Sequence, residues 1–391
     1  MLSGRFGFRA RGMVKPSARR ARPNRVLSGT PRSPGSRRVV DCLPMRLPAD
    51  LVSSVRPAFE GRTVCVTGGA GFIGGHLVDA LLHLGATIRV IDDLSTSTLD
   101  HLADLIDLDP HRVRFVHGSI LDDRSLAEAV QGCGVVFHLA AMGSVPRSVE
   151  QPRRAFAVNA TGTVGVLEAA RASGVGRVVL ASSSSIYGGG SPDEENPAAP
   201  RRESMAPMPL SPYAASKLAA EGACKAYAAS YGLATVALRF FNVFGPRQPA
   251  DSAYAAAIPA FTKRLLAGES PVIFGDGLQT RDFTFVANVV GAMLRAASAP
   301  TAGVSGRVFN VGAGKRTDLV ELCRILARLC GCPHVQPTFA EARAGEVRHS
   351  LADVSAIRAA LGFTPFAGLD EGLSETVAWM RGTLTGLSGQ R

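Results

Sequence analysis

Apolar residues between positions 61 and 245 fall in short continuous runs that alternate with longer amphipathic stretches. The runs predict strands at Thr63–Thr67, Thr87–Ile91, Arg112–Val116, Gly134–Leu139, Arg177–Ser182 and Thr235–Phe240. The stretches between them predict helices, among them Phe72–Leu84, Ala155–Ala172 and Pro212–Tyr231. Continuous apolar strands separated by helices are typical of a parallel sheet that is covered on both faces. The predicted fold class is therefore α/β, with a doubly wound parallel sheet in residues 61–245.

The pattern loosens after about residue 245, where proline and loop segments become more frequent. Later helices are predicted at Asp318–Leu329 and Val354–Leu361. We expect residues 246–391 to form a smaller C-terminal α/β lobe that supplies substrate contacts. Residues 279–300 are expected to return to the larger domain.

Positive charge is concentrated at the amino-terminal end. The chain of 391 residues carries a net charge of +11, but residues 1–50 alone hold twelve Arg or Lys against two Asp. The rest is nearly neutral, which excludes a basic body that binds nucleic acid. Residues 1–60 are rich in Arg, Ser, Pro and Gly without periodicity, and we predict a basic disordered tail. A transit peptide and a tail that binds nucleic acid or an anionic surface are alternatives, but an over-long gene start is favoured, with Met45 as the first residue of the protein.

The cysteines and the hydropathy indicate the compartment. The seven cysteines include no C-x-x-C pair, and no apolar run reaches the roughly 20 residues of a membrane span. We therefore expect a cytoplasmic protein with no membrane attachment, no disulfide framework and no metal site.

A glycine-rich turn follows the first predicted strand. Gly68, Gly71 and Gly74 are spaced as G-x-x-G-x-x-G, and the predicted helix begins at Phe72 and Ile73. In such a turn the first glycine bends the chain, the second leaves room for a pyrophosphate, and the third lets the helix pack against the sheet. The helix N-terminus then presents N–H groups to the phosphates.

The second predicted strand is followed by Asp92, near the position where a ribose-binding acid is expected. Its carboxylate is expected to accept hydrogen bonds from the adenosine ribose and to repel a 2′-phosphate, which favours NAD over NADP. Residues 61–245 are thus predicted to be an NAD-binding Rossmann domain.

Tyr213 and Lys217 lie four residues apart at the start of a predicted helix, so both side chains can point into one cleft. A neighbouring ammonium and a cationic nicotinamide are expected to lower the pKa of the Tyr213 phenol. The pair is then able to remove a proton from a sugar hydroxyl near neutral pH.

These segments resemble the extended short-chain dehydrogenase/reductase family, and within it the NAD-dependent nucleotide-sugar epimerases and dehydratases. The resemblance covers roughly residues 62–365. Besides the glycine turn and the Tyr/Lys pair, it rests on His138–Ala141, Asn159–Thr163, Tyr187–Gly188, Arg239–Gln248, Gly275–Gly277, Gln279–Phe283 and Asn310–Gly312.

The resemblance implies a role for individual residues. Ser183, four residues before the Tyr of the Tyr-Gly pair, corresponds to the catalytic Ser or Thr that relays a proton to Tyr213. Residues implied to contact the cofactor are Ser119, Ile120, Ala140 and Asn159. Asn242, Arg281 and Arg343 are implied to bind the substrate diphosphate. The family usually has Gly-Asp-Ile, with the Asp near adenine, where this chain has Gly118-Ser119-Ile120. The Ser119 hydroxyl can still form a hydrogen bond at this position.

The resemblance also indicates the reaction. Dehydratases of the family have Asp-Glu directly after the catalytic Thr, and decarboxylases usually keep the Glu. This chain has Ser184 and Ser185 there, which cannot act as carboxylic acids. A 4-epimerase that passes through a transient 4-keto sugar does not need that acid, so epimerisation is predicted.

The loop that contains Ser144 and Arg147 resembles that of the UDP-N-acetylglucosamine 4-epimerases. A bulky Tyr gates the sugar pocket in family members restricted to glucose and galactose, and Ser350 stands at that position here. The predicted substrates are therefore UDP-GlcNAc and UDP-GalNAc, with UDP-glucose and UDP-galactose as additional ones. Arg147 facing a uronate would instead indicate a UDP-glucuronate 4-epimerase. A dehydratase, a reductase and a non-catalytic NAD-sensing protein are further alternatives. The family resemblance implies a homodimer.

Overall fold

The computed structural model describes residues 47–189, 198–250, 256–342 and 347–388. Its centre is a sheet of seven parallel strands in the order β11-β6-β5-β4-β1-β2-β3. Their bounds are β1 Thr63–Thr67, β2 Thr87–Asp92, β3 Val113–His117, β4 Val135–His138, β5 Arg177–Ser183, β6 Ala234–Phe240 and β11 Arg307–Val311. The predicted α/β class and its parallel sheet are confirmed. The strand order reverses between β1 and β4, where open α/β sheets bind their ligands beyond the carboxyl ends of the strands.

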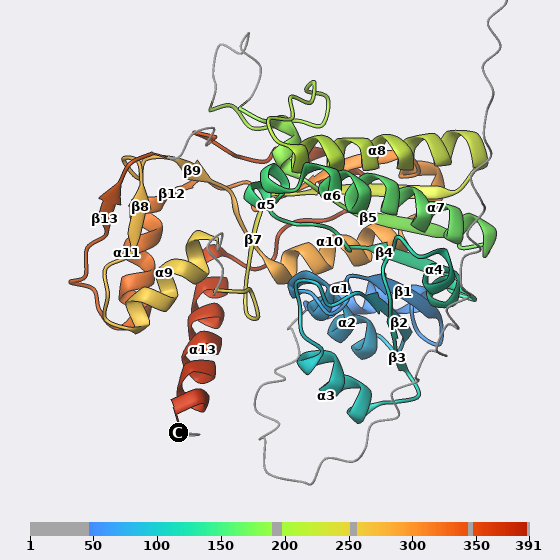
Figure 1. Ribbon diagram of the computed structural model, residues 1–391, viewed down its shortest axis with the longest axis horizontal. Helices are drawn as coiled ribbons and strands as arrows, with labels where there is room; N and C mark the ends of the chain where they lie inside the picture. The colour runs from blue at the N-terminus through green and yellow to red at the C-terminus, as the bar shows by residue number, and fades with distance from the viewer. Residues whose placement is uncertain (1–46, 190–197, 251–255, 343–346, 389–391) are drawn as a thin grey trace, which may run out of the picture. The chain divides into compact units, whose positions relative to one another are not determined.

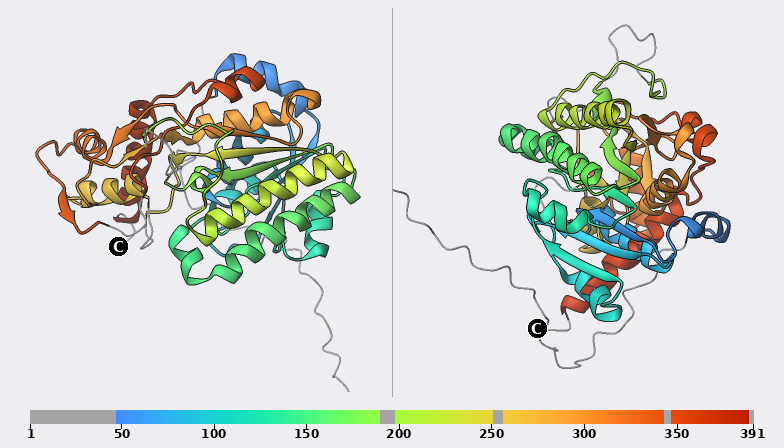
Figure 2. Two further views of the ribbon diagram at one scale, coloured as in Figure 1. Left: turned by 90° about the horizontal axis from the view of Figure 1, so that it is seen from above. Right: turned by 90° about the vertical axis from the view of Figure 1, so that its right-hand side faces the viewer.

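Helices cover both faces of this sheet (Figure 1; Figure 2, left). One face packs against α2 (Phe72–His83) and α10 (Val286–Ser298), and the other against α4 (Asp123–Val130), α7 (Gly162–Ala172) and α8 (Pro212–Tyr231). The strands are apolar on both sides because each face is buried in its own hydrophobic cluster. Helix α3 (Asp100–Leu108) packs beside α2.

The segment before α7 is helical throughout but changes its winding. Helices α5 (Val145–Glu150) and α6 (Pro152–Phe156) lead into one π-helical turn, Ala157–Thr161, and then into α7. Turns of this kind are frequent at functional sites because they redirect a side chain. Here the turn contains Asn159.

The predicted tail over residues 1–60 is wrong for its last part. Residues Ala49–Val55 form helix α1, and Arg56–Ala58 a short 3₁₀ turn. Leu51 and Val55, four residues apart, lie on one face of α1, and they are buried with Phe59 in the hydrophobic cluster that includes α10. Residues 1–46 lie outside the described part of the chain.

The smaller lobe, at the left of Figure 1, is built from two parallel strands and three helices. These are β8 (Val272–Phe274), β13 (Thr338–Ala340), α9 (Ala257–Leu266), α11 (Leu319–Cys330) and α13 (Leu369–Ser388). Phe244, Phe261 and Leu322 belong to its core. Strand β11 and helix α12 (Ser355–Leu361), which the sequence pattern assigned to the lobe, lie instead on the large sheet and its helices.

Two small ladders join the lobe to the sheet. Strand β7 (Asn242–Phe244) pairs with β10 (Phe283–Phe285), and β9 (Thr280–Arg281) pairs with β12 (Thr317–Asp318). Among the described residues no helix is both long and apolar enough to cross a membrane.

Candidate active site

The glycine turn connects β1 to α2 with almost no free space. Gly68 has a φ of 71°, and a Cβ there would lie 2.6 Å from the backbone nitrogen of Ala140. A Cβ on Gly74 would lie 2.2 Å from the carbonyl oxygen of Gly68. Both positions therefore require glycine. After this four-residue turn, α2 begins with Phe72 and Ile73. Gly71 precedes Phe72 as the N-cap residue.

The carboxylate of Asp92 lies beside this turn, at the end of β2. It accepts hydrogen bonds from the N–H groups of Ala70, at 3.1 Å, and Leu94, at 2.9 Å. Burial raises the pKa of Asp92, and these two hydrogen bonds act against that effect. The structure thus brings the predicted ribose acid next to the predicted phosphate turn.

The other predicted cofactor residues lie at the carboxyl ends of β3 and β4. Ser119 and Ile120 follow β3, and the Ser119 hydroxyl accepts a hydrogen bond from Leu121 N–H. The N–H of Ala140 donates to the Thr67 hydroxyl, which ties the end of β4 to β1. Their common edge is the one that the glycine turn occupies.

Asn159, a further predicted cofactor residue, is held by hydrogen bonds from two other segments. It is buried, and its amide oxygen accepts a hydrogen bond of 2.8 Å from Met142 N–H. Its amide nitrogen donates to the hydroxyl of Ser216 on α8. Asn159 therefore links the loop after β4 to the helix that carries Tyr213 and Lys217.

Ser183, Tyr213 and Lys217 meet where β5 ends and α8 begins. The Ser211 side chain caps α8 at its N-terminus, and the Tyr213 N–H donates to the Ser148 hydroxyl. The Lys217 ammonium donates a hydrogen bond of 2.8 Å to the carbonyl oxygen of Ala181. The Tyr213 phenol is hydrogen-bonded to Ser183, whose Oγ also accepts from the N–H and hydroxyl of Ser185.

The protonation of this group is set mainly by burial. Burial raises the pKa of the Tyr213 phenol, and the hydrogen bond to Ser183 lowers it in part. The predicted lowering relies on the charges of Lys217 and a cationic nicotinamide, and burial acts against it because desolvation disfavours the phenolate. Burial also lowers the pKa of Lys217 to about 8, while the carboxylate of Glu221 raises it.

His138 lies beneath this group at the end of β4. Its ring nitrogens contact the Thr67 hydroxyl at 2.7 Å and the Thr163 hydroxyl at 2.9 Å. Burial lowers the pKa of His138 to about 3, so the imidazole stays neutral and acts as a structural link between β1, β4 and α7.

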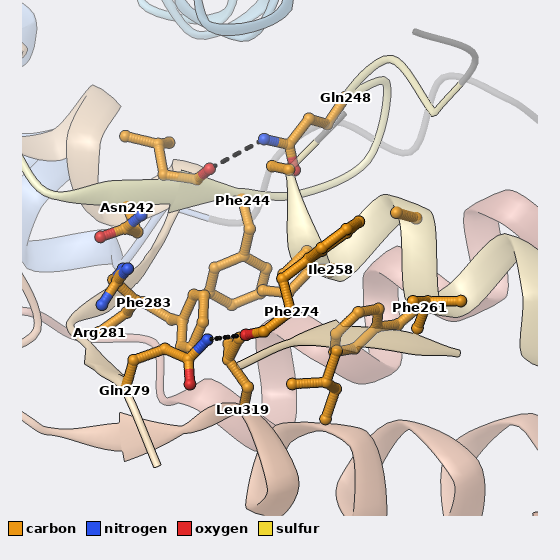
Figure 3. A pocket seen from close by; sticks show the side chains of 16 residues that line it. Asn242, Phe244, Gln248, Ile258, Phe261, Phe274, Gln279, Arg281, Phe283 and Leu319 are labelled. Carbon is orange, nitrogen blue, oxygen red and sulfur yellow. Dashed lines mark hydrogen bonds between the residues drawn. The ribbon is translucent and has the colours of Figure 1, made fainter. Parts of the chain in front are cut away.

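A cavity of about 270 Å³ lies beside the small ladders of the lobe, and both Asn242 and Arg281 line it (Figure 3). Its wall comes from β7 to β10, α9 and the start of α11, and not from the seven-stranded sheet. The remaining wall is mostly aromatic and aliphatic, and includes Phe244, Phe261 and Phe283. Two of the three predicted diphosphate ligands thus face one site. Arg343, the third, lies outside the described residues.

The three residues predicted to contact the sugar come from two segments. The Ser144 hydroxyl caps α5 by accepting a hydrogen bond from Arg147 N–H. Ser350 is half-buried, and its N–H donates a hydrogen bond to the carbonyl oxygen of Thr280, the residue before Arg281. This hydrogen bond brings Ser350, the predicted sugar gate, close to Arg281, a predicted phosphate ligand.

Comparison with known proteins gives this arrangement a family. The model of the NAD dependent epimerase/dehydratase family matches residues 64–312. A UDP-glucose 4-epimerase of Mycolicibacterium smegmatis is 41% identical over 318 residues, which are 81% of this chain and 97% of that protein. The chain belongs to the NAD-dependent epimerase/dehydratase family.

Members of this epimerase/dehydratase family with different reactions are similar to the chain. A dTDP-glucose 4,6-dehydratase of an Actinoplanes species is 35% identical over 329 residues, 81% of this chain and 97% of the relative. The solved UDP-N-acetylglucosamine 4-epimerase of Methanobrevibacter ruminantium M1, in complex with UDP-N-acetylmuramic acid, superposes with a TM-score of 0.76. It is 36% identical, and the match covers 83% of this chain and 99% of that structure.

The protein depends on NAD, as its family does, and the residues present fit that cofactor. The glycine turn leaves no side chain between the first turn of α2 and a pyrophosphate, and the Asp92 carboxylate stands beside it. This is the arrangement that dinucleotides require at a strand-order reversal.

Sequence reasoning missed two amides of the family's cavity. Gln248 and Gln279 donate hydrogen bonds to the Val243 and Phe274 carbonyls, and the structure shows no hydrogen-bond partner for their buried Oε1 atoms. A buried amide oxygen without a hydrogen-bond partner costs free energy, so each of these oxygens is suited to accept a hydrogen bond from an N–H group of a ligand. Both glutamines belong to segments on which the family resemblance rests, Arg239–Gln248 and Gln279–Phe283, but the resemblance assigned neither of them a role.

Proposed function

We propose that the protein is an NAD-dependent 4-epimerase of UDP sugars that interconverts UDP-GlcNAc and UDP-GalNAc, with UDP-glucose and UDP-galactose as additional substrates. One observation carries the choice of reaction. The hydroxyl that contacts Ser183 Oγ, at 2.9 Å, belongs to Ser185, and Ser184 is its neighbour. Hydroxyls therefore stand where an elimination reaction would need a carboxylic acid and its conjugate base.

The acid–base work falls to three side chains. NAD, when bound, supplies the hydride acceptor and donor for the sugar C4. The Tyr213 phenolate takes the proton of the 4-hydroxyl, directly or through Ser183, and later returns it. The Lys217 ammonium favours the phenolate by its charge. The same residues serve both directions, since no proton or electron is consumed overall.

The substrate is proposed to be held by its nucleotide and not by its sugar. Asn242, Arg281 and Arg343 bind the diphosphate, for which a guanidinium offers bidentate hydrogen bonds. The aromatic cavity accommodates the nucleoside, with Gln248 and Gln279 as acceptors for base N–H groups. A sugar that is loosely held at the far end can then present either face to the cofactor.

Ser350 supports the choice of an N-acetylated sugar. Its hydroxymethyl group, beside Arg281, leaves space that a Tyr ring would occupy. An acetamido group needs this space, and glucose does not. A UDP-glucuronate 4-epimerase is the second candidate, and the half-buried Arg147 favours it. The next residue, Ser148, accepts a hydrogen bond from the Tyr213 N–H, and a guanidinium in this position is suited to bind a carboxylate.

We also propose a homodimer. Val149, Phe156 and Val164, on the outer surface of α5 to α7, are 63%, 43% and 39% exposed. Apolar side chains that gather along one surface mark interaction sites more often than scattered ones do. A second copy of the chain would cover them through the same surface.

The deciding experiment is incubation of the purified protein with UDP-GlcNAc, without added reductant, and separation of the products. Epimerisation predicts UDP-GalNAc with no net change in NAD. Accumulation of a 4-keto-6-deoxy sugar would indicate a dehydratase. Parallel incubations with UDP-glucose and UDP-glucuronate rank the substrates, and turnover of UDP-glucuronate alone would contradict the proposed sugar.

A further inference from the structure

A buried ion pair lies directly behind the catalytic residues. Glu221 on α8 and Arg239 on β6 are each only 5% exposed. The guanidinium donates two hydrogen bonds to the carboxylate, of 3.0 Å from Nε and 2.8 Å from Nη2. Neither residue lines the nucleotide cavity. A buried pair of charges is not a reliable source of stability, because desolvation offsets the attraction, so its position raises the question of a role in the reaction.

The Glu221 carboxylate touches both elements that carry the catalytic groups. It follows Lys217 by one helical turn on α8. Its Oε1 also accepts a hydrogen bond of 2.5 Å from the hydroxyl of Ser182 on β5. Ser182 lies between Ala181, whose carbonyl holds the Lys217 ammonium, and Ser183. One carboxylate thus ties the strand that presents Ser183 to the helix that presents Tyr213 and Lys217.

The opposite side of the pair is anchored to the chain beyond the sheet. Arg239 donates a hydrogen bond of 2.7 Å to the Tyr187 hydroxyl and lies over its ring. The Tyr187 hydroxyl donates in turn to the Asn310 amide oxygen, at 2.7 Å. The Asn310 amide nitrogen donates to the carbonyls of Arg201 and Asp353. With partners on every side, the carboxylate cannot turn away from Ser182 without breaking several hydrogen bonds.

We propose that Glu221 is a positioning residue for the epimerase reaction, which fixes Ser183 and Lys217 relative to Tyr213 through Ser182 and stabilises the Lys217 ammonium by its charge. The proposal rests on the proposed function for its kinetic readout only. The two parts are separable, because Ser182 provides the mechanical tie and the carboxylate provides the charge.

The electrostatic part has a stated direction. Burial lowers the pKa of Lys217, and Glu221 is the first of the groups that act against it, followed by Cys224 on the same helix. From the sheet, the neutral imidazole of His138 also faces Lys217. Loss of the carboxylate therefore lets Lys217 lose its proton at a lower pH. In the proposed mechanism a neutral Lys217 no longer favours the phenolate, so the ionisation of Tyr213 should move to higher pH.

Ser182→Ala and Glu221→Gln test the two parts separately. Ser182→Ala removes the tie and keeps the charge, so kcat should fall about tenfold with KM little changed and the pH profile unmoved. Glu221→Gln keeps the acceptor oxygen and removes the charge, so the alkaline limb of kcat should move down by about one pH unit. Glu321→Gln, which removes an exposed carboxylate paired with Arg324, is the matched control and should change neither.

A second measurement needs no substrate. Ultraviolet absorption follows phenol ionisation, and subtraction of the same titration in Tyr213→Phe isolates Tyr213. In Glu221→Gln this ionisation should move to higher pH, whereas Ser182→Ala and Glu321→Gln should titrate as the wild type does. Should Glu221→Gln fail to fold, the double variant Glu221→Gln/Arg239→Met leaves no unpaired buried charge and is titrated in the same way.

Wild-type kcat in Ser182→Ala would overturn the positioning role. An unmoved Tyr213 titration in Glu221→Gln, or in the double variant, would overturn the electrostatic role. Failure of the wild type to epimerise any UDP sugar would instead defeat the proposed function, and the titration would still decide the role of Glu221.

Discussion

The Lys217 ammonium donates its 2.8 Å hydrogen bond to the backbone carbonyl of Ala181, an oxygen that substitution of the side chain does not remove. Ala181 is two residues before Ser183 on the same strand. The Lys217 ammonium and the Ser183 hydroxyl are therefore both positioned by the carboxyl end of β5. Catalytic geometry depends on how β5 and α8 pack, which connects activity to the core.

Tyr213→Phe should remove turnover while leaving the fold and bound NAD in place. The variant loses only the hydroxyl that accepts and returns the proton, and such groups contribute about 10²- to 10⁴-fold. Product formation from UDP-GlcNAc and the absorbance of retained cofactor are the two measurements. Turnover within tenfold of wild type would show that another group is the base.

The rate should decline as the pH rises through about 8. Burial lowers the pKa of Lys217 to about 8, so Lys217 loses its proton below the ordinary lysine range, and above that pH the phenolate has no neighbouring cation. A pH profile of kcat measures the limb. In Lys217→Arg the side chain keeps its charge, so the limb should move to higher pH at a lower overall rate. An identical limb in that variant would assign it to another group.

Ser350→Tyr should narrow the range of sugars. The ring fills the space proposed for the acetamido group, so turnover of UDP-GlcNAc should fall by about 100-fold or more, as steric exclusion does when a pocket cannot relax. Turnover of UDP-glucose should change by less than about threefold. Coupled assays with both substrates measure the ratio. Undiminished N-acetyl turnover would show that Ser350 does not gate the pocket.

Asp92→Asn should shift the preference between the two nicotinamide cofactors. The amide keeps the size of the side chain but loses the charge that binds ribose hydroxyls and repels a 2′-phosphate. NAD should bind about tenfold more weakly, and NADP more tightly than to wild type. Titration calorimetry measures both. Asp370→Asn, at an exposed position in the first turn of α13, is the control and should leave both affinities unchanged.

Phe156→Arg should convert the proposed dimer into a monomer. Phe156 is 43% exposed in the π-turn region between α6 and α7, and a charge there would be buried without a partner in the dimer interface. Analytical ultracentrifugation measures the mass. Phe339→Arg, at an exposed aromatic residue of the lobe, should leave the oligomeric state as it is. A wild-type protein that sediments as a monomer would contradict the dimer.

The sequence pattern predicted the strands and the catalytic helix closely. The predicted bounds of β1 and α8 agree with the structure, because an unbroken apolar run and a capped helix with Pro at its start are local signals. Helix α1 was missed, since its two buried apolar residues, Leu51 and Val55, follow a long stretch rich in arginine and proline. The composition of residues 1–60 as a whole does not show the apolar face of this helix, which is visible only in the four-residue spacing of its apolar side chains.

Long-range polar contacts were beyond the sequence. A Glu one turn after Lys217 and an Arg in the apolar strand β6 are visible in the chain, but their pairing depends on which face of α8 meets which strand. Asn159 was expected at the cofactor, whereas its amide holds Met142 and Ser216. Its place in a π-helical turn was not foreseeable, because that turn adds one residue to a helix with no distinguishing composition.

The polypeptide crosses between the large sheet and the smaller lobe repeatedly. It leaves after β7, returns at β10, leaves again after β11, and comes back to pack α12 on the sheet before α13 ends in the lobe. Several parallel connections resist rotation about any single hinge. We therefore expect the enclosure around the sugar to keep its dimensions during turnover, so that a change of stereochemistry depends on torsional freedom within the substrate.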